Sequence, residues 1–121
     1  MVGTADPAKA TAFYDAVLGA LGVPAGQGGF YSHKGLHFGV GKPRNGEPAT
    51  AANGGTIGFA AANKEQVDAF YAQGLAHGGT CEGPAGPRPK APGNAYGAYL
   101  RDPDGNKICA FCDLGDDGKK E

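Results

Sequence analysis

The sequence predicts a single α+β domain made of two similar modules, and three observations support this prediction. Two segments carry apolar residues at helical spacing between a polar start and a glycine stop. These two segments match each other when one is slid along the chain onto the other. Short segments of strand character, bounded by glycine and proline, follow each of them. The length of 121 residues suits one domain with one hydrophobic core.

The first predicted helix begins at Asp6. Its carboxylate can accept hydrogen bonds from the free N–H groups of the first turn, and Pro7 suits the first helical position. Gly22 provides a natural stop. Between these ends, apolar side chains recur at intervals of three and four and form one face, made of Ala10, Phe13, Tyr14, Val17, Leu18 and Leu21.

The second predicted helix begins at Asn63, with Gln66 three residues later in the position of a capping box. Gly78 and Gly79 end it. Its apolar face is made of Val67, Phe70, Tyr71 and Leu75.

The two helices look like copies of one unit. A single offset, which we call the helix offset, places Ala69-Phe70-Tyr71 on Ala12-Phe13-Tyr14, Leu75 on Leu18, and Gly79 on Gly22. A repeat of this kind implies two similar modules that share a core.

The predicted strands occupy 29–33 and 36–40 in the first half, and 56–60, 96–101 and 107–112 in the second. The last two form a hairpin, because Pro103 and Gly105 suit the turn between them. By the helix offset, a first strand equivalent to 56–60 would start before Met1. Only its end, 1–4, is present, so this strand should be short.

The remaining segments are rich in glycine, proline and polar residues. Residues 82–94 read as an irregular stretch that carries Arg88 and Lys90 and could fold over the mouth of a pocket. The predicted organisation is one domain over 1–114, with module one at 1–42, a linker at 43–54, module two at 55–114 and a disordered tail at 115–121.

Composition narrows the class of partner. A net charge of −1 and a pI near 6.3 provide no basic excess for nucleic acid or anionic lipid. No apolar run suits a membrane span or a signal peptide, so the expected compartment is the cytoplasm. Three cysteines (Cys81, Cys109 and Cys112) are expected to be reduced thiols. The expected partners are small molecules or other proteins.

The helix AFYDAVLGALG and the hairpin YGAYLRDPDGNKICAFC resemble the glyoxalase/bleomycin-resistance/extradiol-dioxygenase (vicinal oxygen chelate) superfamily. The resemblance covers nearly the whole chain, and RDPDGNKI is its most specific part. It implies two βαβββ modules whose sheets form half-barrels around a cavity, packed within one chain or exchanged in a symmetric homodimer. The enzymes of this family hold a divalent metal that activates a substrate with vicinal oxygens.

The resemblance also implies where metal ligands would fall. The first-strand His or Gln would lie before Met1, the His of the strand that opens module two falls on Thr56, and the Glu of the last strand falls on Cys109. Matching LHFGV to ICAFC places His37 opposite Cys109. His37 and Cys109 are therefore weak metal candidates, and no complete site of the His/carboxylate type is expected.

Other roles for these residues stay open. Cys109 and Cys112 are three apart on a strand, so their sulfurs should diverge. Cys109 would be a nucleophile only if a neighbour such as His37 lowered its pKa, and His37 is an acid, base or ligand, or simply a half-buried histidine. Tyr99 and Arg101 share one strand face and are pocket candidates, although Arg101 can also pair with an acidic neighbour in the turn.

Two functions follow from these residues. The first is a protein that binds a small molecule in an aromatic-lined cavity without chemistry and without a cofactor, which the incomplete ligand set favours. The second is a metal-dependent lyase, isomerase or dioxygenase, which would need a ligand-bearing segment before Met1. A homodimer is expected for either function, because half-barrel sheets bury their edges against a partner.

Overall fold

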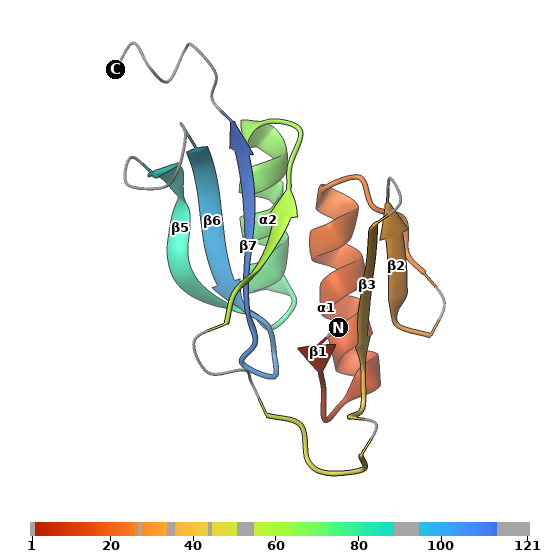
Figure 1. Cartoon of the computed structure of the whole chain (residues 1–121). Coiled ribbons are helices and arrows are strands. Elements are labelled where there is room, and N and C mark those ends of the chain that lie inside the picture. Colours follow the sequence, from red (N-terminus) through yellow and green to blue (C-terminus); the bar gives the residue numbers. More distant parts are fainter. Residues whose placement is uncertain are drawn as a thin grey trace.

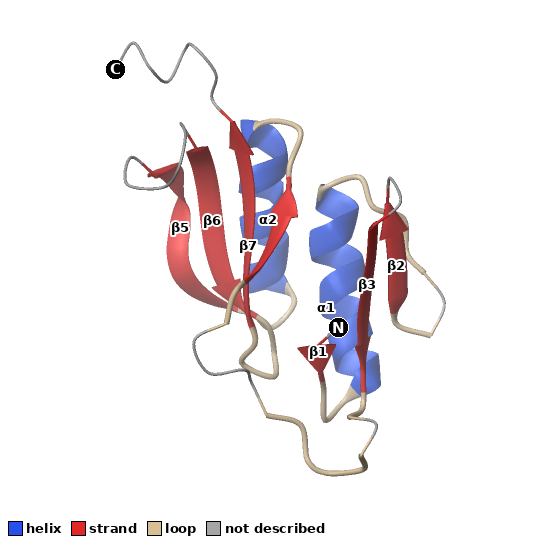
Figure 2. Ribbon diagram, in the orientation of Figure 1, coloured by secondary structure: helices blue, strands red, loops and turns tan. Residues whose placement is uncertain are grey.

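The protein consists of two helices and two sheets (Figures 1 and 2). The computed structural model describes residues 2–26, 28–33, 36–43, 45–50, 55–88 and 95–113. Their elements are β1 (Val2–Gly3), α1 (Pro7–Ala20), β2 (Phe30–His33), β3 (Leu36–Gly41), β4 (Ile57–Ala60), α2 (Lys64–Ala76), β5 (Thr80–Arg88), β6 (Ala95–Arg101) and β7 (Lys107–Asp113). The predicted α+β class and the short first strand are confirmed. Neither helix is long and apolar enough to span a bilayer.

The two modules differ by one strand. The second is a complete βαβββ unit with strand order β4-β7-β6-β5. The first has the order β1-β3-β2, and its described residues between α1 and β2 contain no strand that would correspond to β5. Module one is therefore βαββ where four strands were expected.

Both helices begin as predicted. The Asp6 side chain accepts from the Lys9 N–H at 3.2 Å, with proline at the start of α1. The Asn63 side chain accepts from the Gln66 N–H at 2.9 Å, and the Gln66 amide oxygen reaches back to the Ala62 N–H. These bonds satisfy donors that have no partner inside the helix.

The predicted apolar face of α2 needs one correction. Leu75 is 42% exposed, whereas Leu18, its counterpart in α1, is 1% exposed. Gly74 is the buried residue in the last turn of α2. The helix offset therefore aligns the two helices in sequence, but the C-terminal ends of the two helices are buried to different extents.

The expectation of an irregular stretch over 82–94 is wrong for its first half. Residues 80–88 form β5, and its pairing with β6 shifts register around Gly83. β5 lies at the edge of its sheet, where proline is tolerated because one row of N–H groups faces away from the sheet. Residues 89–94, with Lys90, lie outside the described residues, as does the expected tail at 115–121.

The predicted hairpin of β6 and β7 is confirmed, and its turn holds the two modules together. The Tyr14 hydroxyl of α1 donates to the Asp102 carboxylate at 2.6 Å, and both groups are buried. The Asn106 side-chain amide donates to the same carboxylate at 3.0 Å and to the Gly3 carbonyl of β1 at 3.1 Å. Burial and the nearby Asp102 carboxylate raise the pKa of Tyr14, so its hydroxyl keeps its proton and donates.

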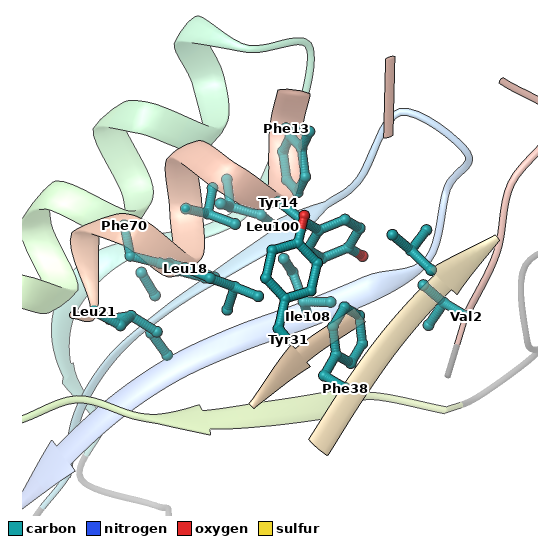
Figure 3. Close-up of a cluster of buried hydrophobic side chains, with 14 of the residues drawn as sticks. Val2, Phe13, Tyr14, Leu18, Leu21, Tyr31, Phe38, Phe70, Leu100 and Ile108 are labelled. Carbon is teal, nitrogen blue, oxygen red and sulfur yellow. The ribbon is translucent and has the colours of Figure 1, made fainter. Parts of the chain in front are cut away.

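The helices and the inner faces of both sheets share one core. The Phe38 ring of β3 lies 4.9 Å from the Tyr14 ring and 5.2 Å from the Phe59 ring of β4, so it joins one sheet to the other. Figure 3 shows the core side chains of both modules in one cluster, with Leu100 and Ile108 from the second sheet. The faces of the sheets that the helices do not cover are left for other contacts.

The backbone pairing confirms the internal repeat and sets its register. The Thr4 N–H donates to the Gly41 carbonyl at 2.9 Å, and the Ala61 N–H donates to the Phe111 carbonyl at 2.7 Å. The helix offset places Ala61 on Thr4, so these two donors are equivalent. Their acceptors must then be equivalent as well, and a larger offset, which we call the strand offset, places Phe111 on Gly41.

Candidate functional site

The face of the second sheet that α2 does not cover gathers most of the predicted site residues. Ala98, Leu100, Ile108 and Ala110 are buried on the α2 side. Because side chains alternate along a strand, the residues between them point to the other side. We call that side the open face; it carries Gly58, Glu82, Arg88, Gly97, Tyr99, Arg101, Lys107, Cys109, Phe111 and Asp113.

Tyr99 lies at the centre of the open face between two cations. The Lys107 ammonium lies 5.4 Å from the centre of the Tyr99 ring, and the Arg88 guanidinium lies 5.5 Å from it. Both distances are within the range of cation–π attraction. Sequence reasoning named Tyr99 but assigned no role to Lys107, which alternation from Cys109 would have placed on the same face.

Arg101 lies on the open face with its charge matched. Its guanidinium pairs with the Glu82 carboxylate of β5 and also donates to the Gly105 carbonyl at 2.9 Å. The expected acidic partner exists, although it comes from β5 and not from the turn. Arg101 is therefore held in place at the end of β6, the strand that also carries Tyr99.

Cys109 is half-buried opposite Tyr99 and beside Gly58. A side-chain carbon added at Gly58 would lie 3.4 Å from the Cys109 sulfur and 3.1 Å from the Phe111 ring, so this glycine gives both side chains room. Burial raises the pKa of Cys109, and the nearby Lys107 lowers it by less. The thiol form is therefore favoured at neutral pH, which does not suit a nucleophile.

The other two candidates lie at the margins. Thr56 is exposed and directly precedes β4, close to Gly58. His37 belongs to the first sheet, where it is exposed and its Nδ1 lies 2.8 Å from the Ser32 hydroxyl oxygen. The four candidates Thr56, Tyr99, Arg101 and Cys109 thus belong to the second module, and His37 to the first.

The strand register changes the partner expected for Cys109. By the strand offset, Cys109 corresponds to Gly39, and His37 corresponds to Lys107. The alignment of His37 with Cys109 was out by two positions along the strand. Because an even displacement keeps every side chain on its own face, alternation alone does not separate the two alignments.

The donor set does not fit the metal site of the resembled family. The ligand positions that fall within the chain hold Gly39, Thr56 and Cys109. Glycine has no side-chain donor, a threonine hydroxyl is a weak ligand, and metal binding needs the thiolate of Cys109, which burial disfavours. Across the residues that the structure describes, no three His, Cys, Asp or Glu side chains are grouped to hold a metal ion.

A separate hollow lies on the first module. It has a volume of about 560 Å³ and lies between the outer side of α1 and strands β2 and β3. Its polar side chains come from Thr11, Asp15, Tyr31 and Lys42, and the Tyr31 hydroxyl donates to Asp15 at 2.8 Å. None of the predicted site residues lines it, so this hollow and the open face are separate.

Comparisons with known proteins agree with the sequence motifs. The family model of the Glyoxalase/Bleomycin resistance protein/Dioxygenase superfamily matches residues 1–110. A glyoxalase/bleomycin resistance protein from Albidiferax ferrireducens T118 is 52% identical, with a TM-score of 0.87 over 93% of this chain and 94% of that one. A search of curated proteins gave no match.

Two more distant structures share the fold. A lactoylglutathione lyase from Agrobacterium tumefaciens is 25% identical, with a TM-score of 0.59 over 92% of this chain and 88% of that one. A glyoxalase/bleomycin resistance protein/dioxygenase family enzyme from Burkholderia phytofirmans PsJN is 20% identical, with a TM-score of 0.67 over 93% and 94%.

Proposed function

Since this chain belongs to the Glyoxalase/Bleomycin resistance protein/Dioxygenase superfamily, we propose that it binds a small organic molecule on its open face without a bound metal ion. The observation that carries this proposal is the set of residues at the family's ligand positions. Gly39 and Thr56 replace side chains that would bind a metal, and Cys109 is held as a thiol. The open face nevertheless keeps aromatic and charged groups that recognise small molecules.

The chemistry of the open face supports binding more than catalysis. Tyr99 and Phe111 provide aromatic surface, and Phe111 is 45% exposed although it lies on a strand of the sheet. Arg101 is held by Glu82, and its side chain is therefore suited to positioning and not to proton transfer, since guanidinium does not deprotonate. The described residues of this face include no histidine, the side chain that most often serves as a general base near neutral pH.

In this family the sheets of the modules form half-barrels. A second copy of the chain can cover the open face of the first. We infer that a homodimer would turn the open face into an enclosed pocket, as half-barrel sheets bury their exposed surfaces against a partner. The ligand would then lie between the open face and the covering chain, with water excluded from around Tyr99.

A metal-dependent lyase is the alternative function. One structural relative at 25% identity is a lactoylglutathione lyase, which keeps an enzymatic role in view. The same experiment tests both functions. The purified chain is incubated with Zn, Ni, Mn and Fe(II), desalted and analysed for metal, with the lyase relative treated in parallel as a comparison.

We expect no metal to be retained in stoichiometric amount by this chain. One metal ion per chain, lost in a Cys109→Ala variant, would overturn the metal-free proposal and point to an enzyme. Ligand binding is measured separately, by the change in melting temperature with a library of small organic molecules, because a ligand that binds only the folded state raises it. A library that leaves the melting temperature of the chain unchanged would contradict binding.

A further inference from the structure

The side chain of Arg88 lies across the open face against three glycines, Gly83, Gly86 and Gly97. Side-chain carbons added at Gly83, Gly86 and Gly97 would lie 3.3, 3.6 and 3.9 Å from atoms of Arg88. A side-chain carbon at Gly83 would be closer to the Arg88 guanidinium than most such contacts, and those at Gly86 and Gly97 would touch the side chain. The backbone of Arg88 pairs with Ala95 at the end of β5. The three glycines leave room for its side chain to extend back along the sheet to the Tyr99 ring.

The guanidinium of Arg88 is fixed by neutral partners. It donates to the carbonyl oxygens of Pro84, Gly86 and Pro87 and lies against the Tyr99 ring. These contacts restrict the side chain before any ligand arrives, which lowers the entropy lost on binding. They do not neutralise its charge, since a carbonyl dipole is not a counter-ion.

Lys107 brings a second positive charge to the same ring. It lies on the strand on the other side of β6 from Arg88, and its ammonium is 5.4 Å from the Tyr99 ring centre. Its charge already acts on its surroundings, since it lowers the pKa of Cys109 against the effect of burial. Two cations therefore converge on one tyrosine from opposite neighbouring strands.

The acidic groups of the open face do not cancel this pair. Glu82 is engaged by Arg101, and this is the ion pair found among the described residues. Asp113 lies opposite Ala95 at the other end of β7 from Lys107, and the Arg88 side chain runs away from that end. The positive charge is therefore concentrated around Tyr99.

We propose that Arg88 and Lys107 form an anion-binding pair and that the ligand of the open face is a small organic acid. Its carboxylate would lie between the two cations at the edge of Tyr99, and its apolar part would lie against the exposed Phe111 ring. This inference rests on the proposed function and adds the chemical class of the ligand. An anion at this position is attracted by both cations.

The test compares two probes that differ in charge. Benzoate and benzyl alcohol are titrated into the full-length, isotope-labelled chain, and the amide signals of Gly58, Gly97 and Cys109 are followed by NMR. We expect benzoate to bind more tightly than benzyl alcohol, with an advantage that added salt removes. Arg88→Gln and Lys107→Gln should each weaken benzoate by about tenfold and leave benzyl alcohol unchanged.

Lys64→Gln is the matched control. The Lys64 ammonium lies 5.7 Å from the centre of the Tyr96 ring, the same kind of contact on the α2 side of β6, so its loss should not affect benzoate. Equal binding of both probes, or a benzoate advantage that survives both open-face substitutions, would overturn the anion pair and leave the proposed function standing. Failure of both probes to shift any open-face signal would overturn both.

Discussion

The two modules share their beginnings and differ at their outer edges. Each starts with a strand, a polar N-cap and a helix, related by the helix offset. The second module then adds β5 outside β6, whereas the described residues of the first module have no strand outside β2. Arg88 and Glu82 belong to β5, so the strand that distinguishes the modules also supplies two of the charged groups on the open face.

The two modules also differ beside their hairpin turns. The turn of the second module reaches into the first through Asp102, which accepts from the buried Tyr14 hydroxyl. The position before the turn of the first module holds His33, which is exposed. Among the described residues, the joint between the modules is made by the second hairpin, whose segment RDPDGNKI is the most specific motif of the sequence.

The largest effect should come from breaking this joint. Asp102→Ala removes the acceptor of the Tyr14 hydroxyl and of two backbone N–H groups of the turn. Because these donors would stay buried without partners, we expect the free energy of unfolding to fall by about 4 kcal/mol. Urea unfolding of the variant measures this. His33→Ala is the control and should change stability by less than about 0.5 kcal/mol.

Tyr14→Phe separates the hydrogen bond from the packing. It removes only the hydroxyl and should cost about 1 kcal/mol, and combined with Asp102→Ala it should add little, since the two share one interaction. If the stability of the joint depended on the turn conformation alone, the free-energy losses of the two variants would add in full.

The second largest effect compares equivalent leucines. Leu18 is 1% exposed and Leu75 is 42% exposed, although both occupy the same position in their helices. We expect Leu18→Ala to lower the free energy of unfolding by about 3 kcal/mol, because it leaves a cavity in the shared core. Leu75→Ala should cost less than about 0.5 kcal/mol. Similar losses from both variants would mean that Leu75 is covered in solution, for example by a second copy.

The third effect concerns a glycine where the helices meet. Gly74 of α2 corresponds to Val17 of α1, and a side-chain carbon at Gly74 would lie 2.3 Å from Leu100 and 3.3 Å from Val17. Gly74→Ala should therefore destabilise the protein by about 2 kcal/mol through overpacking, despite the better helix propensity of alanine. Gly19 is the matched control, since nothing lies within 4 Å of a side-chain carbon there. Gly19→Ala should raise the melting temperature, and a rise for Gly74→Ala as well would show that the core has room.

The sequence predicted the features that depend on local chemistry. The N-caps at Asp6 and Asn63 and the hairpin turn at Asp102 depend on residues close in the chain, and each formed where expected. Strand β5 was missed because glycine and proline weaken a strand pattern. Proline is tolerated in an edge strand, but the sequence alone does not show which strand lies at the edge of the sheet.

The candidate site was predicted in part for a related reason. Tyr99 and Arg101 were placed on one face by alternation, and the pairing of β6 with β7 places Cys109, named through the family resemblance, on that face as well. His37 was matched to Cys109 because a displacement by two positions keeps every side chain on its own face, so only the strand pairing reveals that Gly39 is the true counterpart. Arg88 was expected only within an irregular stretch at a pocket mouth, because its reach across three glycines is a property of two strands together.

The smallest effect concerns Cys109, which Gly39 replaces in the first module. Burial raises the pKa of Cys109, so the thiolate that reacts with iodoacetamide should be scarce at neutral pH and become abundant only above the range of an ordinary thiol. Lys107→Gln removes the charge that lowers this pKa and should slow alkylation further. Mass spectrometry of the Cys109 peptide across pH measures both rates.

Cys112 is the internal control for this measurement, because Lys64 and not Lys107 is the cation that lowers its pKa. Its alkylation rate should not respond to Lys107→Gln. If Cys109 instead reacted faster in the folded protein than in the unfolded chain at neutral pH, its thiolate would be stabilised by the fold. The nucleophile hypothesis for Cys109 would then regain support, and the cations around Tyr99 would serve the thiolate as well as an incoming acid.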